Sequence, residues 1–332
     1  MHKILLLCGG ASAEHEISIR SAYNIYTNLD KNKYEAVIVG ISRSKKFYTL
    51  TPEQLKELVD SFGCIADNTY PKANIEPSEF YACFPALHGT GGEDGMIQGY
   101  LEMLDIPYVG NGIGASAICM DKDLTKRILA SHGLPVVPFM TIKKGGTVSY
   151  SQISTHLGDV LFVKAVSQGS SIGTYKTKNQ QEFEQCLEEA FTYGPKVIVE
   201  QAITGREIEC AVLGNDALHA SCLGEVVPNH NHEYYDFLAK KDDEAKLIID
   251  SPLDADVTNT IKELAIKAFR ALDCQGLARV DFFLTPDQTI YINEINTMPG
   301  FTAFSLYPQL LMRDRFSFSN LLDQLIQLAM KE

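Results

Sequence analysis

Two apolar segments near the end of the chain carry charged and amide side chains. They are Ala278-Arg279-Val280-Asp281-Phe282-Phe283 and Ile292-Asn293-Glu294-Ile295-Asn296-Thr297. If both segments are strands, Arg279 and Asp281 share one face, because side chains alternate along a strand. By the same alternation, Ile292, Glu294 and Asn296 share one face of the second strand.

These residue types favour a divalent cation. In a hairpin that places Asp281 opposite Glu294, the oxygens of Asn296 and the Arg279 guanidinium converge on the same place. Two carboxylates about 4 Å apart repel by about 4 kcal/mol at an effective dielectric constant of about 20, so the pair requires a cation. Hard oxygen ligands suit Mg²⁺ and not zinc. The alternative is an exposed charged sheet face, but so many oxygen ligands on apolar strands favour the metal site.

A second segment has the chemistry of a phosphate site. Lys164 ends a predicted strand and is followed by Gln168-Gly169-Ser170-Ser171-Ile172-Gly173, whose small residues leave backbone N–H groups free. The segment by itself could equally be a plain turn. It is not a Walker A loop, because no Gly-Lys pair occurs in the chain, and the GxGxxG spacing of a dinucleotide fingerprint is also missing.

Two polar loops follow other predicted strands. Glu14-His15-Glu16 follows the first strand, where a carboxylate can cap the next helix or bind a substrate amine; capping is the simpler interpretation. The glycine-rich run from His88 to Gly95 also follows a strand, which is where ligand sites lie in α/β folds.

The elements that must position these residues begin with an α/β unit. Residues 4–8 and 37–41 are predicted strands, and residues 22–29 have apolar side chains at the spacing of one helix face. Strand, helix and strand in this order predict a parallel sheet with a right-handed crossover. A further strand at 83–87 and a helix at 96–104 complete a domain that we place at residues 1–111.

We expect a second domain at residues 112–200 and a third at 201–332. Lys143-Lys144-Gly145-Gly146 is predicted to be a tight turn between two strands of the second domain. The remaining predicted helices cover residues 121–130, 180–193 and 257–272, and the remaining strands cover 161–164, 197–201, 207–213, 277–284 and 290–296.

Composition limits the classes of partner. Twenty-nine Lys and Arg against 42 Asp and Glu give a net charge of −13 over 332 residues. This balance argues against nucleic acid and anionic membranes, but not against a phosphorylated small molecule. The eight cysteines contain no CxxC pair, so a zinc ribbon is not expected. No run approaches the ~20 apolar residues of a membrane span, and the N-terminal apolar run is too short for a signal peptide, so we expect a cytoplasmic protein.

Taken in order, these segments resemble the D-alanine–D-alanine ligases of the ATP-grasp superfamily over essentially the whole chain. The matching stretches are 9–17 (GGASAEHEI), 88–99 (HGTGGEDGMIQG), 120–122 (MDK), 169–173 (GSSIG), 205–207 (GRE), 276–283 (GLARVDFF) and 293–301 (NEINTMPGF). Any one is weak, but seven in order are highly specific. The resemblance implies an α/β and α+β fold of three domains, in which a parallel-sheet domain precedes the two that hold ATP between antiparallel sheets.

The resemblance also implies roles for matching positions. The residues expected at ATP are Lys122, Lys164, Gln168, Ser171, Glu200, Glu207 and Lys240. Asp281, Glu294 and Asn296 would hold two Mg²⁺ ions, for which Mn²⁺ could substitute, with Glu294 bridging them.

Other positions are implied at the amino-acid substrates. Glu14 would hold the ammonium of the first D-alanine, and His88 would lie near its carboxylate. The carboxylate of the second D-alanine would be bound by Ser305 and Leu306, and Lys241 in the lid is a further substrate-binding position. Arg279 and the Gly300 N–H would stabilise the oxyanion. Ser170 and Glu14 are the other implied catalytic positions.

The implied reaction has two steps. The first D-alanine attacks the γ-phosphate to give an acylphosphate, and the amine of the second then displaces phosphate, under a mobile lid that excludes water. Its product, D-alanyl-D-alanine, is a peptidoglycan precursor, and members of the family are usually homodimers.

The lid departs from the family pattern. Its run 235–241 reads YDFLAKK, where family members have a YDYEAKY-like run whose last Tyr hydrogen-bonds the first loop Ser. Lys241 therefore stands at a position that helps to select the second substrate, which leaves D-lactate and D-serine as alternative acceptors. Either Lys241 meets Ser170 or Glu14 in the closed state, or Tyr234 or Tyr235 reaches Ser170 and Lys241 faces solvent. A non-catalytic nucleotide-binding protein is a further alternative, against which the intact set of Arg279 and its oxygen ligands argues.

Overall fold

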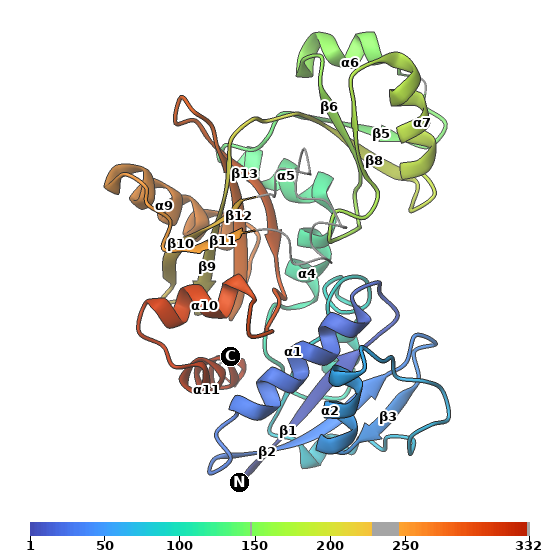
Figure 1. The fold of residues 1–332 in the computed structure, drawn as a ribbon, viewed down its shortest axis with the longest axis vertical. Helices are drawn as coiled ribbons and strands as arrows, with labels where there is room; N and C mark the ends of the chain where they lie inside the picture. Colours follow the sequence, from blue (N-terminus) through green and yellow to red (C-terminus); the bar gives the residue numbers. More distant parts are fainter. Residues whose placement is uncertain (147, 228–245, 331–332) are drawn as a thin grey trace.

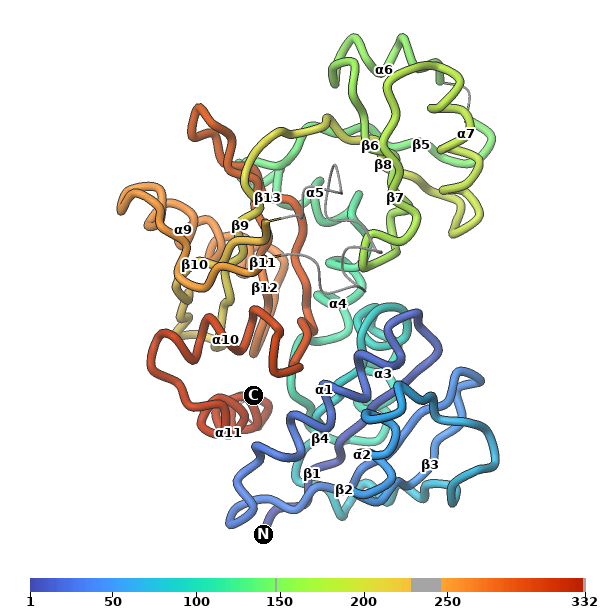
Figure 2. The backbone as a smooth tube through the Cα atoms, in the orientation of Figure 1, coloured from blue at the N-terminus to red at the C-terminus, as the bar shows by residue number. Residues whose placement is uncertain are grey.

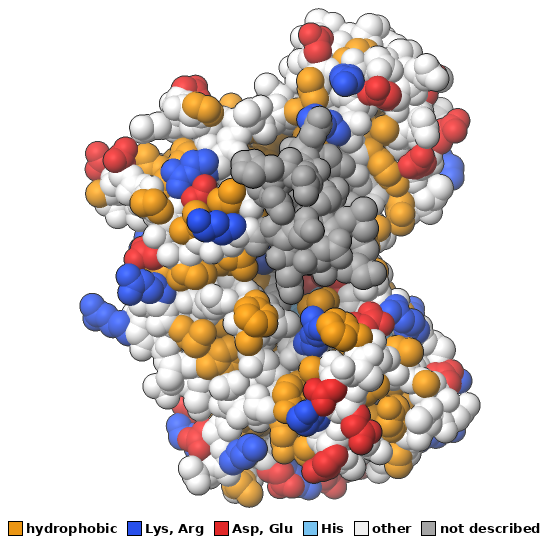
Figure 3. All heavy atoms as spheres, in the orientation of Figure 1, with side chains coloured by type: hydrophobic (Ala, Val, Ile, Leu, Met, Phe, Trp, Pro, Cys, Tyr) orange, Lys and Arg blue, Asp and Glu red, His pale blue; other side chains and the backbone are white. Residues whose placement is uncertain are grey.

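The computed structural model describes residues 1–146, 148–227 and 246–330, and every statement below concerns these residues. Three separate sheets organise them, one in each third of the chain (Figure 1). None of the helices in these ranges combines the length and the apolar character that a membrane crossing requires. Positive and negative side chains are mixed over the face shown in Figure 3.

The first sheet confirms the predicted parallel unit. It contains β1 (His2–Gly9), β2 (Tyr34–Ile41), β3 (Phe47–Leu50) and β4 (Ala82–Pro85). Their order is β3-β2-β1-β4, and β1 runs parallel to both β2 and β4. Six consecutive residues of β1 are buried, as expected for a strand that is covered on both faces. The helices of this part are α1 (His15–Asn28), α2 (Pro52–Asp60), α3 (Met96–Met103) and the short η1 (Pro77–Glu79).

The second sheet is antiparallel throughout. Its order is β5-β8-β6-β7, from β5 (Phe139–Lys143), β6 (Leu161–Ala165), β7 (Thr174–Thr177) and β8 (Lys196–Gln201). Helices α6 (Tyr150–Leu157) and α7 (Gln180–Ala190) belong to this part. Helices α4 (Ile113–Met120) and α5 (Lys122–Ser131) come before it in the chain and contact the later strand Ile290–Asn296. The expectation that residues 143–146 join two strands was wrong, because the turn leads into α6. A capping box between Ser149 and Gln152 starts that helix.

The third sheet is also antiparallel, with the order β11-β10-β9-β12-β13. Its strands are β9 (Arg206–Leu213), β10 (His219–Val227), β11 (Lys246–Ile249), β12 (Leu277–Leu284) and β13 (Ile290–Asn296). Helix α9 (Ala255–Ala271) packs on β9, β10 and β12, and α10 (Leu306–Arg313) packs on β9, β10 and β11. The chain then ends in α11 (Phe318–Ala329).

The two ends of the chain share one apolar core. Helix α11 contacts α1, and Figure 2 shows the C-terminal helix beside the N-terminal part of the molecule. The rings of Phe84 and Phe301 meet edge to face with centroids 5.4 Å apart, and both side chains are fully buried. The segment that follows β13 is therefore fixed against β4 as well as against its own sheet.

Candidate active site

A buried group of two lysines and one glutamate lies where α5 crosses the second sheet. The Lys164 Nζ on β6 donates to Glu200 Oε2 on β8 at 2.6 Å, and the Lys126 Nζ on α5 lies 3.1 Å from Glu200 Oε1. The Glu200 and Lys126 side chains are only 2% and 1% exposed. We call Lys126, Lys164 and Glu200 the phosphate-side cluster.

Burial and charge act against each other in this cluster. Burial raises the pKa of Glu200, but the ammonium groups of Lys126 and Lys164 outweigh it and bring this pKa to about 2. Burial lowers the pKa of Lys126. Sequence reasoning missed Lys126, although its position four residues after Lys122 places both lysines on one face of the same helix.

Lys122 joins three segments of the chain. It is the first residue of α5, and its Nζ donates to the backbone carbonyl of Gln168 at 2.6 Å. The same Nζ lies 3.6 Å from Glu294 Oε2 on β13. Lys122 therefore places the loop around Gln168 against the third sheet. Ser171 lies in this loop with φ of 59°. Glu207 is the second residue of β9, and its charge adds to that of Glu200 in raising the pKa of Lys164.

The second charged group occupies one face of β9, β12 and β13. Arg279 donates through Nε and Nη2 to both carboxylate oxygens of Asp281 at 2.8 Å, and its Nε lies 2.9 Å from Glu209 Oε2. The Asn296 amide donates to Asp281 Oδ2 at 2.9 Å, and Glu294 is paired with Asp281 in register. We call these five residues the carboxylate cluster; Glu209 was not predicted.

The register of the hairpin agrees with the prediction at one place and differs at another. Asp281 stands opposite Glu294, as predicted, but a bulge between Asp281 and Phe282 pairs Phe282 with Ile292. Ile292 is therefore fully buried in the core beside α9, and the expectation that it shares the face of Glu294 was wrong.

The carboxylate cluster has the ligand chemistry of a hard divalent cation. The carboxylates of Asp281 and Glu294 face each other, and Asn296 uses its NH₂ group on Asp281, so its amide oxygen is the atom left to serve as a ligand. Among the described residues, no group of three or more His, Cys, Asp or Glu side chains is arranged to hold a metal. The fit therefore depends on two carboxylates and an amide, a set that suits Mg²⁺.

Glu14 contacts the phosphate loop instead of capping its helix. Its side chain forms no capping hydrogen bond at α1, and the Ser170 Oγ donates to Glu14 Oε1 at 2.6 Å. A Cβ on Gly89 would lie 2.7 Å from Glu14 Oε2, and one on Gly169 would lie 3.6 Å from it. Two glycines thus allow both loops to approach this carboxylate.

Beside Glu14, a second carboxyl group is protonated near neutral pH. Burial, reinforced by the charge of Glu14, raises the pKa of Glu93 to about 8. Glu93 Oε1 accepts a hydrogen bond from the Gly89 N–H at 2.8 Å.

His88 is buried and uses both ring nitrogens. Its Nδ1 lies 3.0 Å from the Met298 carbonyl, and its Nε2 lies 2.8 Å from Ser21 Oγ. Burial lowers the pKa of His88, so the ring is neutral near pH 7. A contact with a substrate carboxylate would require His88 to give up one of these two bonds.

Gly300, Ser305 and Leu306 come together at the start of α10. A Cβ on Gly300 would lie 2.6 Å from Ser305 Oγ, and the Thr302 N–H donates to that same oxygen at 3.0 Å. The Leu306 side chain is 5% exposed and belongs to the core. Only its backbone N–H, in the first turn of α10, can serve a bound anion.

Comparison with known proteins decides the family. The family model described as D-ala D-ala ligase N-terminus matches residues 3–111, and the one described as D-ala D-ala ligase C-terminus matches residues 128–327. The chain belongs to the D-alanine–D-alanine ligase family.

Individual relatives agree with this assignment. D-alanine–D-alanine ligase A of Chromobacterium violaceum is 40% identical, with 99% of this chain and 95% of the relative covered. The solved D-alanine–D-alanine ligase of Coxiella burnetii has a TM-score of 0.87 and 41% identity, covering 99% of this chain and 94% of that one. The solved VanG D-Ala:D-Ser ligase of Enterococcus faecalis has a TM-score of 0.84 and 33% identity, with 99% of each chain covered.

Part of the family site lies outside the described residues. The predicted lid positions Tyr234, Tyr235, Lys240 and Lys241 all fall in residues 228–245, so their placement stays a prediction. Within the described residues Ser170 bonds directly to Glu14, so the two side chains that Lys241 was predicted to meet lie together.

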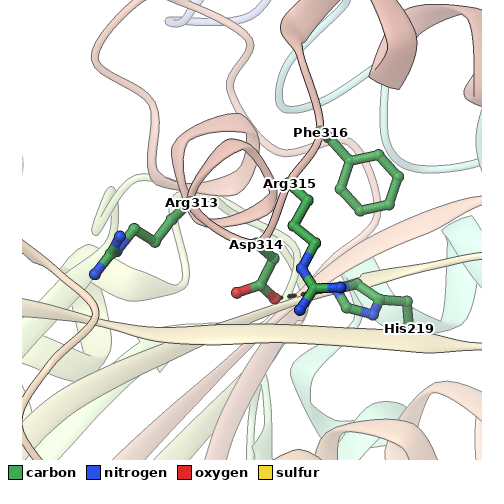
Figure 4. Close-up of a pocket in the computed structure, with 5 residues that line it drawn as sticks. All are labelled: His219, Arg313, Asp314, Arg315 and Phe316. Carbon is green, nitrogen blue, oxygen red and sulfur yellow. Dashed lines mark hydrogen bonds and ion pairs between the residues drawn. The ribbon is translucent and has the colours of Figure 1, made fainter.

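A recess of about 520 Å³ at the other end of α10 is separate from the family site. It is lined by His219, Arg313, Asp314, Arg315 and Phe316 (Figure 4). His219 Nε2 lies 3.0 Å from Asp314 Oδ2, and Arg313 Nη2 lies 3.0 Å from Asp250 Oδ2. Since these charged groups pair with one another, we interpret the recess as a surface ion-pair cluster.

Proposed function

We propose that this chain joins two D-alanine molecules to D-alanyl-D-alanine at the expense of ATP, through an acylphosphate of the first D-alanine. The observation that carries the proposal is the 2.6 Å hydrogen bond between Ser170 and Glu14. It brings the carboxylate suited to a substrate ammonium against a phosphate-binding loop 156 residues away. An amino acid held by Glu14 would thus present its own carboxylate to the terminal phosphate of ATP.

The phosphate-side cluster orients the nucleotide. Lys122 reaches the loop and the third sheet, and Lys164 lies against Glu200. Both lysines would neutralise charge on the phosphoryl oxygens. Glu200, kept ionised by Lys126 and Lys164, is an acceptor suited to the adenine amino group. Gln168 and Ser171 belong to the loop that covers the phosphates, and Glu207 lies on the ribose side.

The carboxylate cluster would hold two Mg²⁺ ions through Asp281, Glu294 and Asn296. Bound there, the ions would neutralise charge on the β- and γ-phosphates. Arg279 keeps Asp281 oriented through two hydrogen bonds, and it presents a permanently charged guanidinium to the reacting carboxyl group.

The second D-alanine would bind at the start of α10. The Ser305 hydroxyl and the Leu306 N–H supply donors for its carboxylate, and the Gly300 N–H beside them supplies one for the oxyanion of the tetrahedral intermediate. One such donor is typically worth about 3 to 4 kcal/mol of barrier. One short segment thus supplies both the donors that bind the second D-alanine and the donor for the oxyanion.

The proposal includes the division into domains at 1–111, 112–200 and 201–332, one sheet in each. A homodimer is the expected assembly, and light scattering of the purified chain tests it.

Phosphate release and dipeptide formation from ATP, Mg²⁺ and D-alanine test the proposal directly. Glu14→Gln is expected to raise the KM for the first D-alanine and lower kcat at least about 100-fold, because a buried ammonium loses its counter-ion. Glu16→Gln is the matched control, because Glu16 lies two residues after Glu14 and forms a surface ion pair with Arg43. No dipeptide from the wild-type chain would refute the proposal.

The same assay tests the acceptor. D-alanine, D-lactate and D-serine are supplied in turn as second substrate, and D-alanine is expected to be preferred. Lys241→Ala with unchanged rate and acceptor preference would exclude an active role for Lys241.

A further inference from the structure

The segment from Met298 to Phe301 carries Gly300 but is held from the other end of the chain. The Ser21 Oγ on α1 accepts the Phe301 N–H at 3.1 Å, and the Asn24 Nδ2 one turn later donates to the Phe301 carbonyl at 2.7 Å. The His88 Nδ1 reaches the Met298 carbonyl at 3.0 Å. Three side chains of the N-terminal part thus fix the backbone on both sides of Gly300.

The partners of His88 and Ser21 determine which atom is the donor in each hydrogen bond. A carbonyl only accepts, so His88 carries its proton on Nδ1 and its Nε2 is an acceptor. The Ser21 hydroxyl therefore donates to Nε2 and accepts from the Phe301 N–H, so that each of its two bonds supports the other. Ser21 is fully buried and His88 is 4% exposed, so water does not replace either partner.

Helix α1 also begins directly after Glu14, the carboxylate assigned to the first ammonium. One rigid helix therefore carries the group that places the first substrate and the group that places the backbone around the oxyanion donor. An error of 1 Å between two such groups can cost about 100-fold in rate.

We propose that Ser21 is a positioning residue for the ligation step, which holds the Gly300 N–H at the oxyanion of the tetrahedral intermediate through its bonds to Phe301 and His88. This inference rests on the proposed function, because it requires the second half-reaction to take place beside Gly300. Asn24 supports the same segment from the carbonyl side.

The test separates the two half-reactions. Ser21→Ala should slow attack by the second amine more than formation of the acylphosphate, so that the waiting acylphosphate is lost to water. We expect the ratio of phosphate released to dipeptide formed to rise several-fold, and the dipeptide kcat to fall on the order of tenfold. The KM for ATP is expected to stay within about twofold, because the two partners of Ser21, His88 and Phe301, are not part of the phosphate-side cluster.

Ser18→Ala is the matched control. Ser18 is also fully buried on α1, and its Oγ accepts the Gly9 N–H at 2.7 Å and donates to the Ala86 carbonyl. Both partners lie in the first domain, so this variant should lose stability while its phosphate-to-dipeptide ratio stays at the wild-type value. A merely structural role of Ser21 would leave the ratio unchanged in both variants, and that result would overturn the inference.

Asn24→Ala provides a second route, because Asn24 is only partly buried. Its ratio should rise in the same direction as that of Ser21→Ala, by a smaller factor, and it decides the matter if Ser21→Ala does not fold. An unchanged ratio in a folded Asn24→Ala protein would then overturn the inference. A wild-type chain that forms no dipeptide would instead refute the proposed function itself.

Discussion

The two charged clusters of the site are built from the same kinds of side chain but carry opposite net charge. With all groups ionised, the phosphate-side cluster has two lysines and one glutamate, so its formal charge is +1. The carboxylate cluster has one arginine and the acidic residues Glu209, Asp281 and Glu294, so its formal charge is −2. One side therefore attracts a nucleotide and the other attracts cations.

The contrast explains how an acidic chain can hold a polyanion. The net charge of −13 belongs to the whole surface, whereas the phosphate-side cluster is buried and local. Lys122, 3.6 Å from Glu294, is the residue where the two clusters meet.

The largest effect is expected on the carboxylate side. Asp281→Asn keeps the shape of the side chain but removes a charge that faces Glu294, so kcat should fall about 100-fold or more and the Mg²⁺ requirement should rise. Dipeptide formation over a range of Mg²⁺ concentrations measures both. Asp287→Asn, in the turn of the same hairpin where Asp287 bonds Thr285 and Thr289, is the control. Full activity of Asp281→Asn at ordinary Mg²⁺ would contradict the assignment of a metal to this side.

A smaller effect is expected on the phosphate side. Lys126→Met leaves Glu200 paired with Lys164 alone, so the cluster becomes neutral and the KM for ATP should rise about tenfold, or about 1.4 kcal/mol. Initial rates at varied ATP measure it, and kcat should change less than KM. Lys267→Met removes an exposed lysine that pairs with Glu263 and should leave KM unchanged. Equal KM values in the two variants would show that the net charge of the cluster has no role.

The pH dependence of stability offers a third comparison, at the buried Glu93 beside Glu14. Its pKa of about 8 in the folded chain lies above the ordinary value of 4.5 because burial, and then the charge of Glu14, disfavour the ionised form. The folded state keeps a proton that the unfolded state releases, so this group lowers the free energy of unfolding as pH rises from about 4.5 to about 8. Each pKa unit corresponds to about 1.4 kcal/mol at most.

Glu93→Gln should therefore lose less stability than the wild type between about pH 5 and about pH 8, as measured by urea unfolding. Asp94→Asn, in the same loop and bonded to the Gly91 and Met96 N–H groups, should follow the wild-type curve. Parallel curves for wild type and Glu93→Gln would show that Glu93 is ionised in the folded protein.

The smallest effect is expected at a surface pair of the same chemistry. Lys56 and Asp60 form an ion pair one turn apart on α2, with side chains 56% and 61% exposed. Lys56→Ala should leave the urea unfolding midpoint and the activity close to those of the wild type, because solvent screens an exposed ion pair. A clear loss of stability in Lys56→Ala would mean that solvent exposure does not weaken this ion pair.

The sequence predicted what depends on local pattern. Alternation placed Arg279 with Asp281 on one face of β12, because side chains repeat every two residues along a strand. The hairpin register that was supposed for the site, with Asp281 opposite Glu294, is the one observed. The bulge at Asp281 was not predictable, since no glycine or proline marks it, and it moved Ile292 into the core. The prediction that residues 143–146 join two strands failed for the opposite reason. The sequence contains the capping signal of α6 at Ser149, but the prediction did not use it.

Contacts between distant segments were beyond the pattern of a single sequence. The bonds from Ser170 to Glu14 and from His88 to Met298 span 156 and 210 residues, and no local periodicity refers to such pairs. The family resemblance placed Glu14 and Ser170 at one site but did not indicate that they touch. The use of Ser21 as an acceptor for Phe301 had no signal in the sequence.

The hydrogen bond between Ser21 and Phe301 also has a consequence for the order in which the chain folds and becomes active. Its two partners are 280 residues apart, so the bond closes a loop that contains nearly the whole polypeptide. Contacts of such long separation are costly to form before the intervening sheets exist. Refolding should therefore restore sheet structure first and catalysis last, and enzymatic turnover becomes an indicator that the two termini have docked.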